Sequence, residues 1–106
     1  MIQELDPSEA ARKLQEGARL IDVRSHAEVA QARLPGAEHV PMHLIPMMAG
    51  QFGRETPIVF YCRSGARSAQ VCYFLAQQGF SNAINLRGGI ISWAQQGMEI
   101  DYAPLN

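Results

Sequence analysis

A cysteine followed by two arginines marks the segment of this sequence where chemistry is most expected. Cys62 directly follows the apolar run 57–61 and begins the segment Cys62-Arg63-Ser64-Gly65-Ala66-Arg67-Ser68. A glycine-containing loop that leads from a strand into a helix can turn several backbone N–H groups toward one point, and the helix N-terminus adds partial positive charge. Because Arg63 and Arg67 add two full charges, every feature of the segment favours Cys62 as a thiolate.

Activation of the thiol is a weak reason for so many donors. A free thiol with a pKa of about 8.5 is roughly 3% ionised at pH 7, so lowering the pKa by about two units gains some 25-fold in thiolate. Nucleophilicity falls roughly 8-fold over the same shift, which leaves about a threefold gain. The loop is therefore expected to hold an anionic substrate or an anionic sulfur intermediate. The alternative, a buried unreactive cysteine, does not explain Arg63, Gly65 and Arg67 within the next five positions.

The composition is that of an ordinary globular protein. The length of 106 residues predicts one domain over residues 1–106. The net charge of −1 argues against a nucleic-acid partner. No apolar run approaches about 18 residues, and no basic segment followed by an apolar stretch opens the sequence, so neither a membrane partner nor export is expected. The two cysteines, Cys62 and Cys72, do not make a disulfide framework, and reduced thiols in a cytoplasmic protein are the expectation.

Strand and helix signals alternate along the chain. Apolar runs predict strands at 20–23, 39–40, 57–61 and 83–86. Caps and helix formers predict helices at 7–15, 25–30, 46–51, 66–78 and 88–96, the first capped by Asp6. This alternation is typical of an α/β domain with a largely parallel sheet, in which ligands bind at the carboxyl ends of the strands. Cys62 lies at such an end.

Three segments occur in an order and spacing that resemble the rhodanese domain, in its single-domain sulfurtransferase form. The first is Leu20-Ile21-Asp22-Val23-Arg24 with Glu28, then Leu34-Pro35-Gly36-Ala37 and Val40-Pro41. The second is the loop 62–68, and the third is Gly88-Gly89-Ile90-Ile91-Ser92-Trp93. The resemblance covers nearly the whole chain and implies a rhodanese-like fold: about five strands in a largely parallel sheet, with helices on both faces.

The resemblance also implies a double-displacement mechanism. Cys62 would attack the outer sulfur of thiosulfate or a related persulfide donor, a small sulfur-donor anion, and become a persulfide. A thiophilic acceptor would then take the sulfur: cyanide in vitro, a thiol or a protein acceptor in the cell. Arg63 would hold the sulfonate end of the donor, Arg67 would close the loop electrostatically, and the backbone of Arg63, Ser64, Gly65, Ala66, Arg67 and Ser68 would bind the anion. No metal and no organic cofactor is needed.

Two departures from the family pattern concern residues that look structural. Val29 stands where an aromatic residue often follows the acid, and Ala32-Arg33 replaces a Gly-His pair before the turn. Asp22, Arg24 and Glu28 are expected to form a charge network that supports the fold beside the loop. Ordinary surface ion pairs, worth little, are the alternative for these three residues.

Two other functions remain open for the domain. A phosphatase or arsenate reductase of related fold would resemble Cys-x5-Arg, whereas Cys62 and Arg67 are separated by four residues, which gives a tighter ring of N–H groups. A non-catalytic or regulatory interaction module is the second alternative, and the presence of Cys62 and both arginines argues against it.

Several residues outside the loop have alternative roles. Cys72 is either a resolving thiol or, as we expect, a helix residue packed on the sheet. His39 and His43 have the spacing of metal ligands, but Pro41 between them argues against one helix and no metal site is expected. The apolar stretch of Met42, Ile45, Met47, Met48 and Phe52 is expected to cover the core; the alternative is that it lines the mouth of the site.

Overall fold

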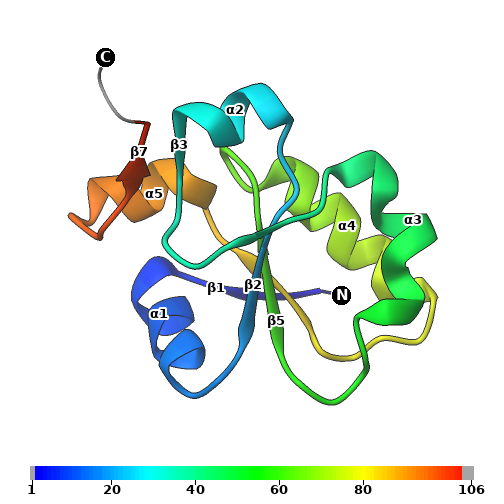
Figure 1. Ribbon diagram of the computed structural model, residues 1–106. Helices are drawn as coiled ribbons and strands as arrows, with labels where there is room; N and C mark the ends of the chain where they lie inside the picture. The colour runs from blue at the N-terminus through cyan, green and yellow to red at the C-terminus, as the bar shows by residue number, and fades with distance from the viewer. Residues whose placement is uncertain (1, 104–106) are drawn as a thin grey trace.

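A parallel sheet forms the centre of the molecule in a computed structural model that describes residues 2–103 (Figure 1). Its five strands lie in the order β1 (Gln3–Leu5), β6 (Ala83–Leu86), β5 (Ile58–Tyr61), β2 (Arg19–Asp22) and β4 (Glu38–His39), and every neighbouring pair is parallel. A separate antiparallel pair joins β3 (Ala32–Arg33) to β7 (Asp101–Tyr102). The α/β class and the parallel sheet with about five strands are confirmed.

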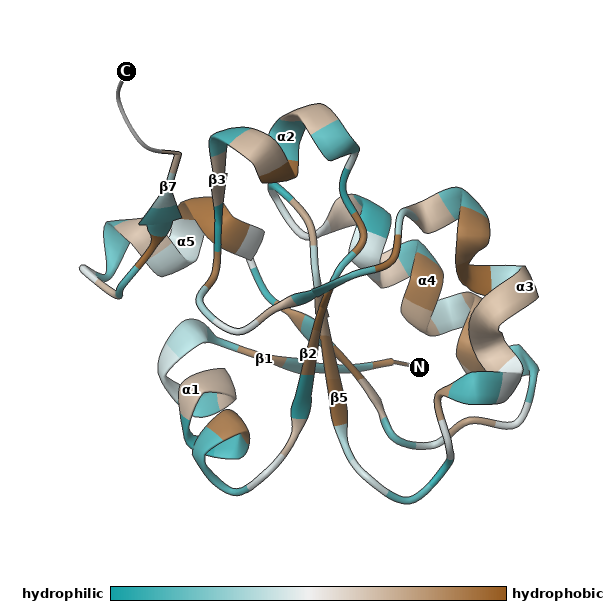
Figure 2. Cartoon of the chain, viewed as in Figure 1, coloured by the Kyte–Doolittle hydropathy of each residue, from teal (hydrophilic) through white to brown (hydrophobic). Residues whose placement is uncertain are grey.

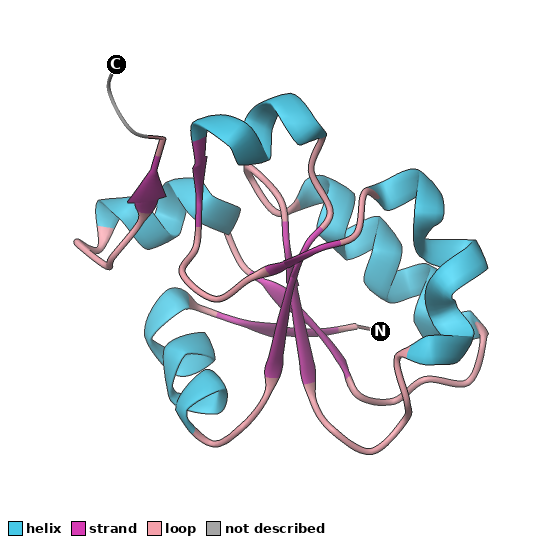
Figure 3. Ribbon diagram, in the orientation of Figure 1, coloured by secondary structure: helices cyan, strands magenta, loops and turns pink. Residues whose placement is uncertain are grey.

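Helices cover both faces of this sheet (Figures 1 and 3). Helices α1 (Pro7–Gln15) and α5 (Gly89–Gln95) pack on one face. On the other face lie α4 (Ala66–Gln77) and α3 (Ile45–Met48), the latter between the 3-10 turns Met42–Leu44 and Ala49–Gln51. A short helix, α2 (His26–Gln31), follows β2. The expected helix at 46–51 therefore begins earlier and is broken into three pieces.

The central strand β5 is buried at all four of its residues, as its uninterrupted apolar sequence (Figure 2) requires. Along β5, Ile58 and Phe60 face the α3–α4 side, whereas Val59 and Tyr61 face the α1–α5 side. This alternation anchors β5 between two cores, so the residue that follows it is held on a rigid support. No helix within residues 2–103 is long and apolar enough to cross a membrane.

Candidate active site

Cys62 lies at the carboxyl end of the central strand, at the head of a tight loop. Its sulfur is buried and accepts a hydrogen bond from the backbone N–H of Gly65 at 3.1 Å, while the Ser68 Oγ lies 3.5 Å away. Gly65 has φ +101°, a conformation that other residues adopt only with strain, and it ends the loop just before α4 begins. The loop thus folds back over the sulfur, as the spacing of its residues predicts.

The first turn of α5 holds the other side of the loop. The N–H of Ile90 donates to the carbonyl of Cys62 at 3.0 Å, and the N–H of Ile91 donates to the carbonyl of Arg63 at 3.2 Å. These bonds fix the two loop carbonyls on α5. The segment from Gly88 to Trp93, the third of the segments that carry the family resemblance, therefore contacts the loop backbone directly.

Opposing effects set the pKa of the Cys62 thiol. Burial raises it, but hydrogen bonds to the sulfur, among them those from the backbone N–H groups of Ser68, Gly65 and Ser64, hold the pKa below its ordinary value. In contrast, burial raises the pKa of Cys72 to about 12, and that thiol packs in the α3–α4 core. Cys72 is a packed helix residue, as expected, and both cysteines are free thiols in this structure.

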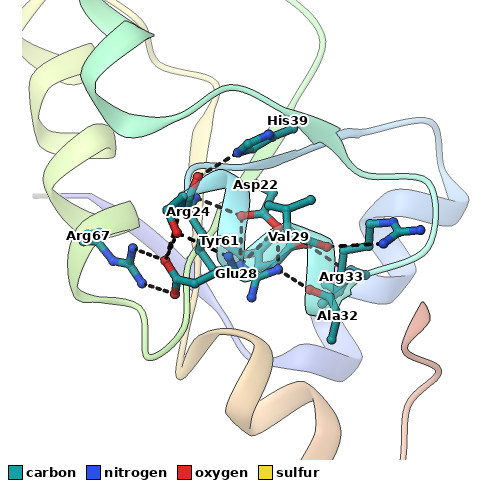
Figure 4. Close-up of polar contacts among 11 residues, drawn as sticks. Asp22, Arg24, Glu28, Val29, Ala32, Arg33, His39, Tyr61 and Arg67 are labelled. Atoms are coloured by element: carbon teal, nitrogen blue, oxygen red, sulfur yellow. Dashed lines mark hydrogen bonds and ion pairs between the residues drawn. The ribbon is translucent and has the colours of Figure 1, made fainter. Parts of the chain in front are cut away.

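Arg67 pairs with Glu28 across 39 positions of sequence (Figure 4). Its two terminal nitrogens donate to the two carboxylate oxygens of Glu28 at 2.8 Å each, a bidentate geometry. Glu28 also accepts from the backbone N–H of Ser25 at 3.1 Å, and Ser25 caps α2 in return. The start of α4 is therefore tied to the start of α2.

The Glu28→Gln variant should lose a stabilisation that depends on pH. Hydrogen bonds from Arg67 lower the pKa of the Glu28 carboxyl from 4.5 to about 2. A lowered pKa in the folded state means that the contribution to stability is complete above about pH 4.5 and is lost as the pH falls toward 2. We expect urea unfolding to show native protein more stable than Glu28→Gln at pH 7, with the difference shrinking between pH 4.5 and 2. A difference that stayed constant over that range would contradict the pairing.

Asp22 and Arg24 form a second, buried pair that is separate from Glu28 (Figure 4). Arg24 donates to Asp22 at 2.7 Å and to the carbonyl of Ala32 at 2.6 Å. The expectation of one network of Asp22, Arg24 and Glu28 was therefore wrong: Glu28 faces the loop, and its partner is Arg67. The buried pair instead fixes the chain between β2 and β3, and so positions α2.

The Asp22→Asn variant should be strongly destabilised. Arg24 is only 5% exposed, so removing its counter-charge leaves a buried unpaired guanidinium, at a cost of about 3–5 kcal/mol. The matched control is Glu38→Gln, which breaks a bidentate pair with Arg19 whose side chains are 46% and 32% exposed and should cost less than about 1 kcal/mol. Urea unfolding of both variants measures the contrast; equal losses would contradict it.

Two hollows border the loop, one beside each of its arginines. A groove of about 540 Å³ lies beside Arg67 and is lined by Val23, Arg24, Ser25, His26, Pro41, Met42, His43 and Pro46. A smaller hollow of about 270 Å³ lies beside the exposed Arg63, with Ile90, Ile91 and Tyr102 among its lining residues. A donor or acceptor can therefore approach the loop next to either arginine.

The remaining candidate residues take structural positions. The ring of His39 lies 2.7 Å from the carbonyl of Arg24 and contacts the ring of His26 edge-on. Within residues 2–103, no three His, Cys, Asp or Glu residues gather closely enough to hold a metal ion. Of the apolar stretch, Ile45 and Phe52 are buried in the core, as expected. Met42 packs against that core and also lines the larger hollow, whereas Met47 is 79% exposed and is not among the lining residues of either hollow.

Sequence reasoning missed two residues behind the loop, Glu4 and Asn85. Asn85 is buried on β6, where its amide nitrogen donates to Glu4 at 2.8 Å and to the carbonyl of Gly65 at 3.2 Å. A signal was present: Asn85 is the polar residue of an otherwise apolar strand that ends just before Gly88. Glu4 gave none, because the short strand β1 has little hydrophobic pattern.

Comparison with known proteins gives the family and the fold. The sequence pattern of the rhodanese-like domain family matches residues 6–96. The chain belongs to this family. It is 45% identical to a sulfurtransferase of Allochromatium vinosum, over 94% of this chain and 95% of that protein, and 30% identical to the thiosulfate sulfurtransferase GlpE of Haemophilus influenzae, over 95% and 96%. A solved rhodanese-like domain protein of Staphylococcus aureus superposes with a TM-score of 0.81 at 31% identity, covering 94% of this chain and 99% of that one. The rhodanese-like fold is thereby confirmed, and the relatives support a sulfurtransferase role.

Proposed function

We propose that this rhodanese-family protein moves sulfane sulfur from thiosulfate, or a related persulfide donor, to a thiophilic acceptor through a persulfide on Cys62. The observation that carries the proposal is the loop itself. The Cys62 sulfur lies at hydrogen-bond distance from the N–H of Gly65, and the loop bears Arg63 and Arg67. Such a site suits a reaction in which an anionic sulfur donor binds and an anionic persulfide forms.

The first half-reaction forms one S–S bond and breaks another. The Cys62 thiolate attacks the outer sulfur of thiosulfate, and sulfite leaves with the electron pair of the broken bond. Arg63, which is exposed at the rim of the smaller hollow, binds the sulfonate oxygens of the donor. Arg67 is held by Glu28, so its main role is to fix the loop around the new persulfide.

The second half-reaction returns the cysteine. A nucleophile attacks the outer sulfur of the persulfide, the bond to Cys62 breaks, and Cys62 leaves as a thiolate. Cyanide would give thiocyanate in an assay, and a thiol or a protein acceptor would take the sulfur in the cell. We place the reaction in the cytoplasm, where a reducing environment keeps Cys62 available as a thiol. The exchange uses no metal or organic cofactor.

The spacing of the loop favours sulfur over phosphate as the atom it holds. Four residues separate Cys62 from Arg67, and the N–H of Gly65 already contacts the sulfur at 3.1 Å. One residue less than in a Cys-x5-Arg loop removes up to about 3.5 Å of chain reach. A single sulfur atom fits this shorter ring better than a tetrahedral phosphate does.

Thiocyanate formation tests the proposal. We expect turnover when the native protein is given thiosulfate and cyanide, with parallel lines in double-reciprocal plots because sulfite leaves before cyanide binds. Hydrolysis of an aryl phosphate serves as the comparison reaction. A folded protein that formed no thiocyanate from thiosulfate or from an organic persulfide, or that hydrolysed the phosphate ester faster, would overturn the proposal.

A further inference from the structure

The hydroxyl of Ser68 has one proton and three acceptors within reach. Its oxygen lies 2.5 Å from the Oδ1 of Asn85, 3.4 Å from the carbonyl of Gly65 and 3.5 Å from the sulfur of Cys62. Two oxygens at 2.5 Å need a proton between them, because that distance is the short limit of an O–H···O hydrogen bond. The Oδ1 of Asn85 carries no proton, so the shared proton is that of Ser68.

The orientation of the Asn85 amide follows from its other two contacts. The carboxylate of Glu4 and the carbonyl of Gly65 are both acceptors, and both lie at the same end of the amide, at 2.8 and 3.2 Å. Only the NH₂ group satisfies them, so Oδ1 must face Ser68. Rotating the amide would place its oxygen against two other acceptors in a site where Asn85 is 1% exposed.

We propose that Asn85, fixed by Glu4 and Gly65, is a positioning residue that holds the Ser68 proton and so withholds it from the Cys62 sulfur. The oxygen of Ser68 then presents its lone pairs to the sulfur, which suits a neutral S–H and disfavours the thiolate. The donors left to the thiolate are the backbone N–H groups of the loop.

The consequence for the reaction is a more basic sulfur. A thiolate with a higher pKa is a stronger nucleophile, by roughly threefold per unit at a slope of about 0.4–0.5, and the rate of attack gains from this as long as the pKa stays below the ambient pH and the thiol remains ionised. This inference rests on the proposed function, since only a sulfur that attacks a donor benefits. It also explains a buried asparagine in an apolar strand behind a loop that already binds anions through its backbone.

Charged groups around the site bear on any titration of Cys62. They are Arg63 in the loop, Arg67 of α4 with Glu28 of α2, the Asp22–Arg24 pair after β2, and Glu4 of β1, whose carboxylate lies 3.8 Å from Arg87. Of these charged groups, only Glu4 loses a hydrogen-bond partner when Asn85 is replaced. Glu4→Gln is therefore the control for charge, because its amide oxygen can still accept from Asn85.

The test is the pH dependence of iodoacetamide alkylation at Cys62, followed by peptide mass spectrometry. In Asn85→Ala the freed hydroxyl can donate to the sulfur, so we expect the apparent pKa to fall by about one unit and the plateau rate of the thiolate to fall about threefold. In the native background, Ser68→Ala should either leave the Cys62 pKa unchanged or lower it. In the Asn85→Ala background, the same substitution should raise the Cys62 pKa. This reversal is a coupling that a purely structural role does not produce.

Three outcomes would overturn the inference. They are an unchanged or raised pKa in Asn85→Ala, a raised pKa for Ser68→Ala in the native background, and a shift in Glu4→Gln as large as that of Asn85→Ala. Ser68→Ala alone decides the question if Asn85→Ala does not fold. The alkylation needs no sulfur donor, so its result is independent of whether the protein transfers sulfur, and failure of either idea can be recognised separately.

Discussion

Replacing Cys62 with serine should reduce thiocyanate formation by at least about 10⁴-fold, since loss of a covalent nucleophile has effects of this size or larger. A serine hydroxyl has no neighbouring general base here: the groups that contact the sulfur are the N–H of Gly65 and the hydroxyl of Ser68. A serine also cannot carry sulfane sulfur as a persulfide. The measurement is the initial rate with thiosulfate and cyanide, with circular dichroism to confirm folding.

The matched control is the second cysteine. Cys72→Ala removes a buried thiol from the α3–α4 core and should lower the free energy of unfolding by about 1 kcal/mol while leaving turnover within about twofold of native. Activity that survived in Cys62→Ser, or disappeared in a folded Cys72→Ala, would show that the nucleophile is misassigned.

The Gly89→Ala variant should lose both stability and sulfur transfer. A Cβ on Gly89 would overlap the carbonyl oxygen of Arg63 and lie 2.5 Å from that of Cys62, both of them backbone atoms that no side-chain rotation can move. The loop would have to leave the first turn of α5, which breaks the hydrogen bonds that hold it. We expect a loss of roughly 3 kcal/mol or more in urea unfolding, from overpacking together with strain at positive φ.

Gly97 supplies a matched control at the other end of the same helix. It has φ +75°, close to the +60° of Gly89, but a Cβ there would meet nothing within 4 Å. Gly97→Ala should therefore cost only the backbone strain, about 1–2 kcal/mol, and retain activity. Equal losses in the two variants would mean that conformation alone, and not the contact with the catalytic loop, requires glycine at Gly89.

Much of the fold and the core of the candidate site are local in sequence and could be predicted. The strand, the loop 62–68 and the following helix are contiguous, and Asp6 caps the first helix with Glu9 in the expected way. Strands β1, β3 and β7 were missed because each has only two or three residues, too few to show a period. Their existence depends on partners far along the chain.

The contacts that support the loop could not be predicted for the same reason. Glu28 was expected to join Asp22 and Arg24, its neighbours in sequence, yet it binds Arg67. Which acid meets which base depends on where α2 and α4 begin in space. The role of Asn85 likewise depends on Glu4, which lies 81 positions away.

Mass spectrometry of the protein after incubation with thiosulfate tests the central claim most directly. Because the first half-reaction leaves a persulfide, we expect a gain of about 32 Da, the mass of one sulfur atom, located on the peptide that contains Cys62 and removed by cyanide. No gain in mass with thiosulfate or with an organic persulfide, or a gain on Cys72 alone, would contradict the account.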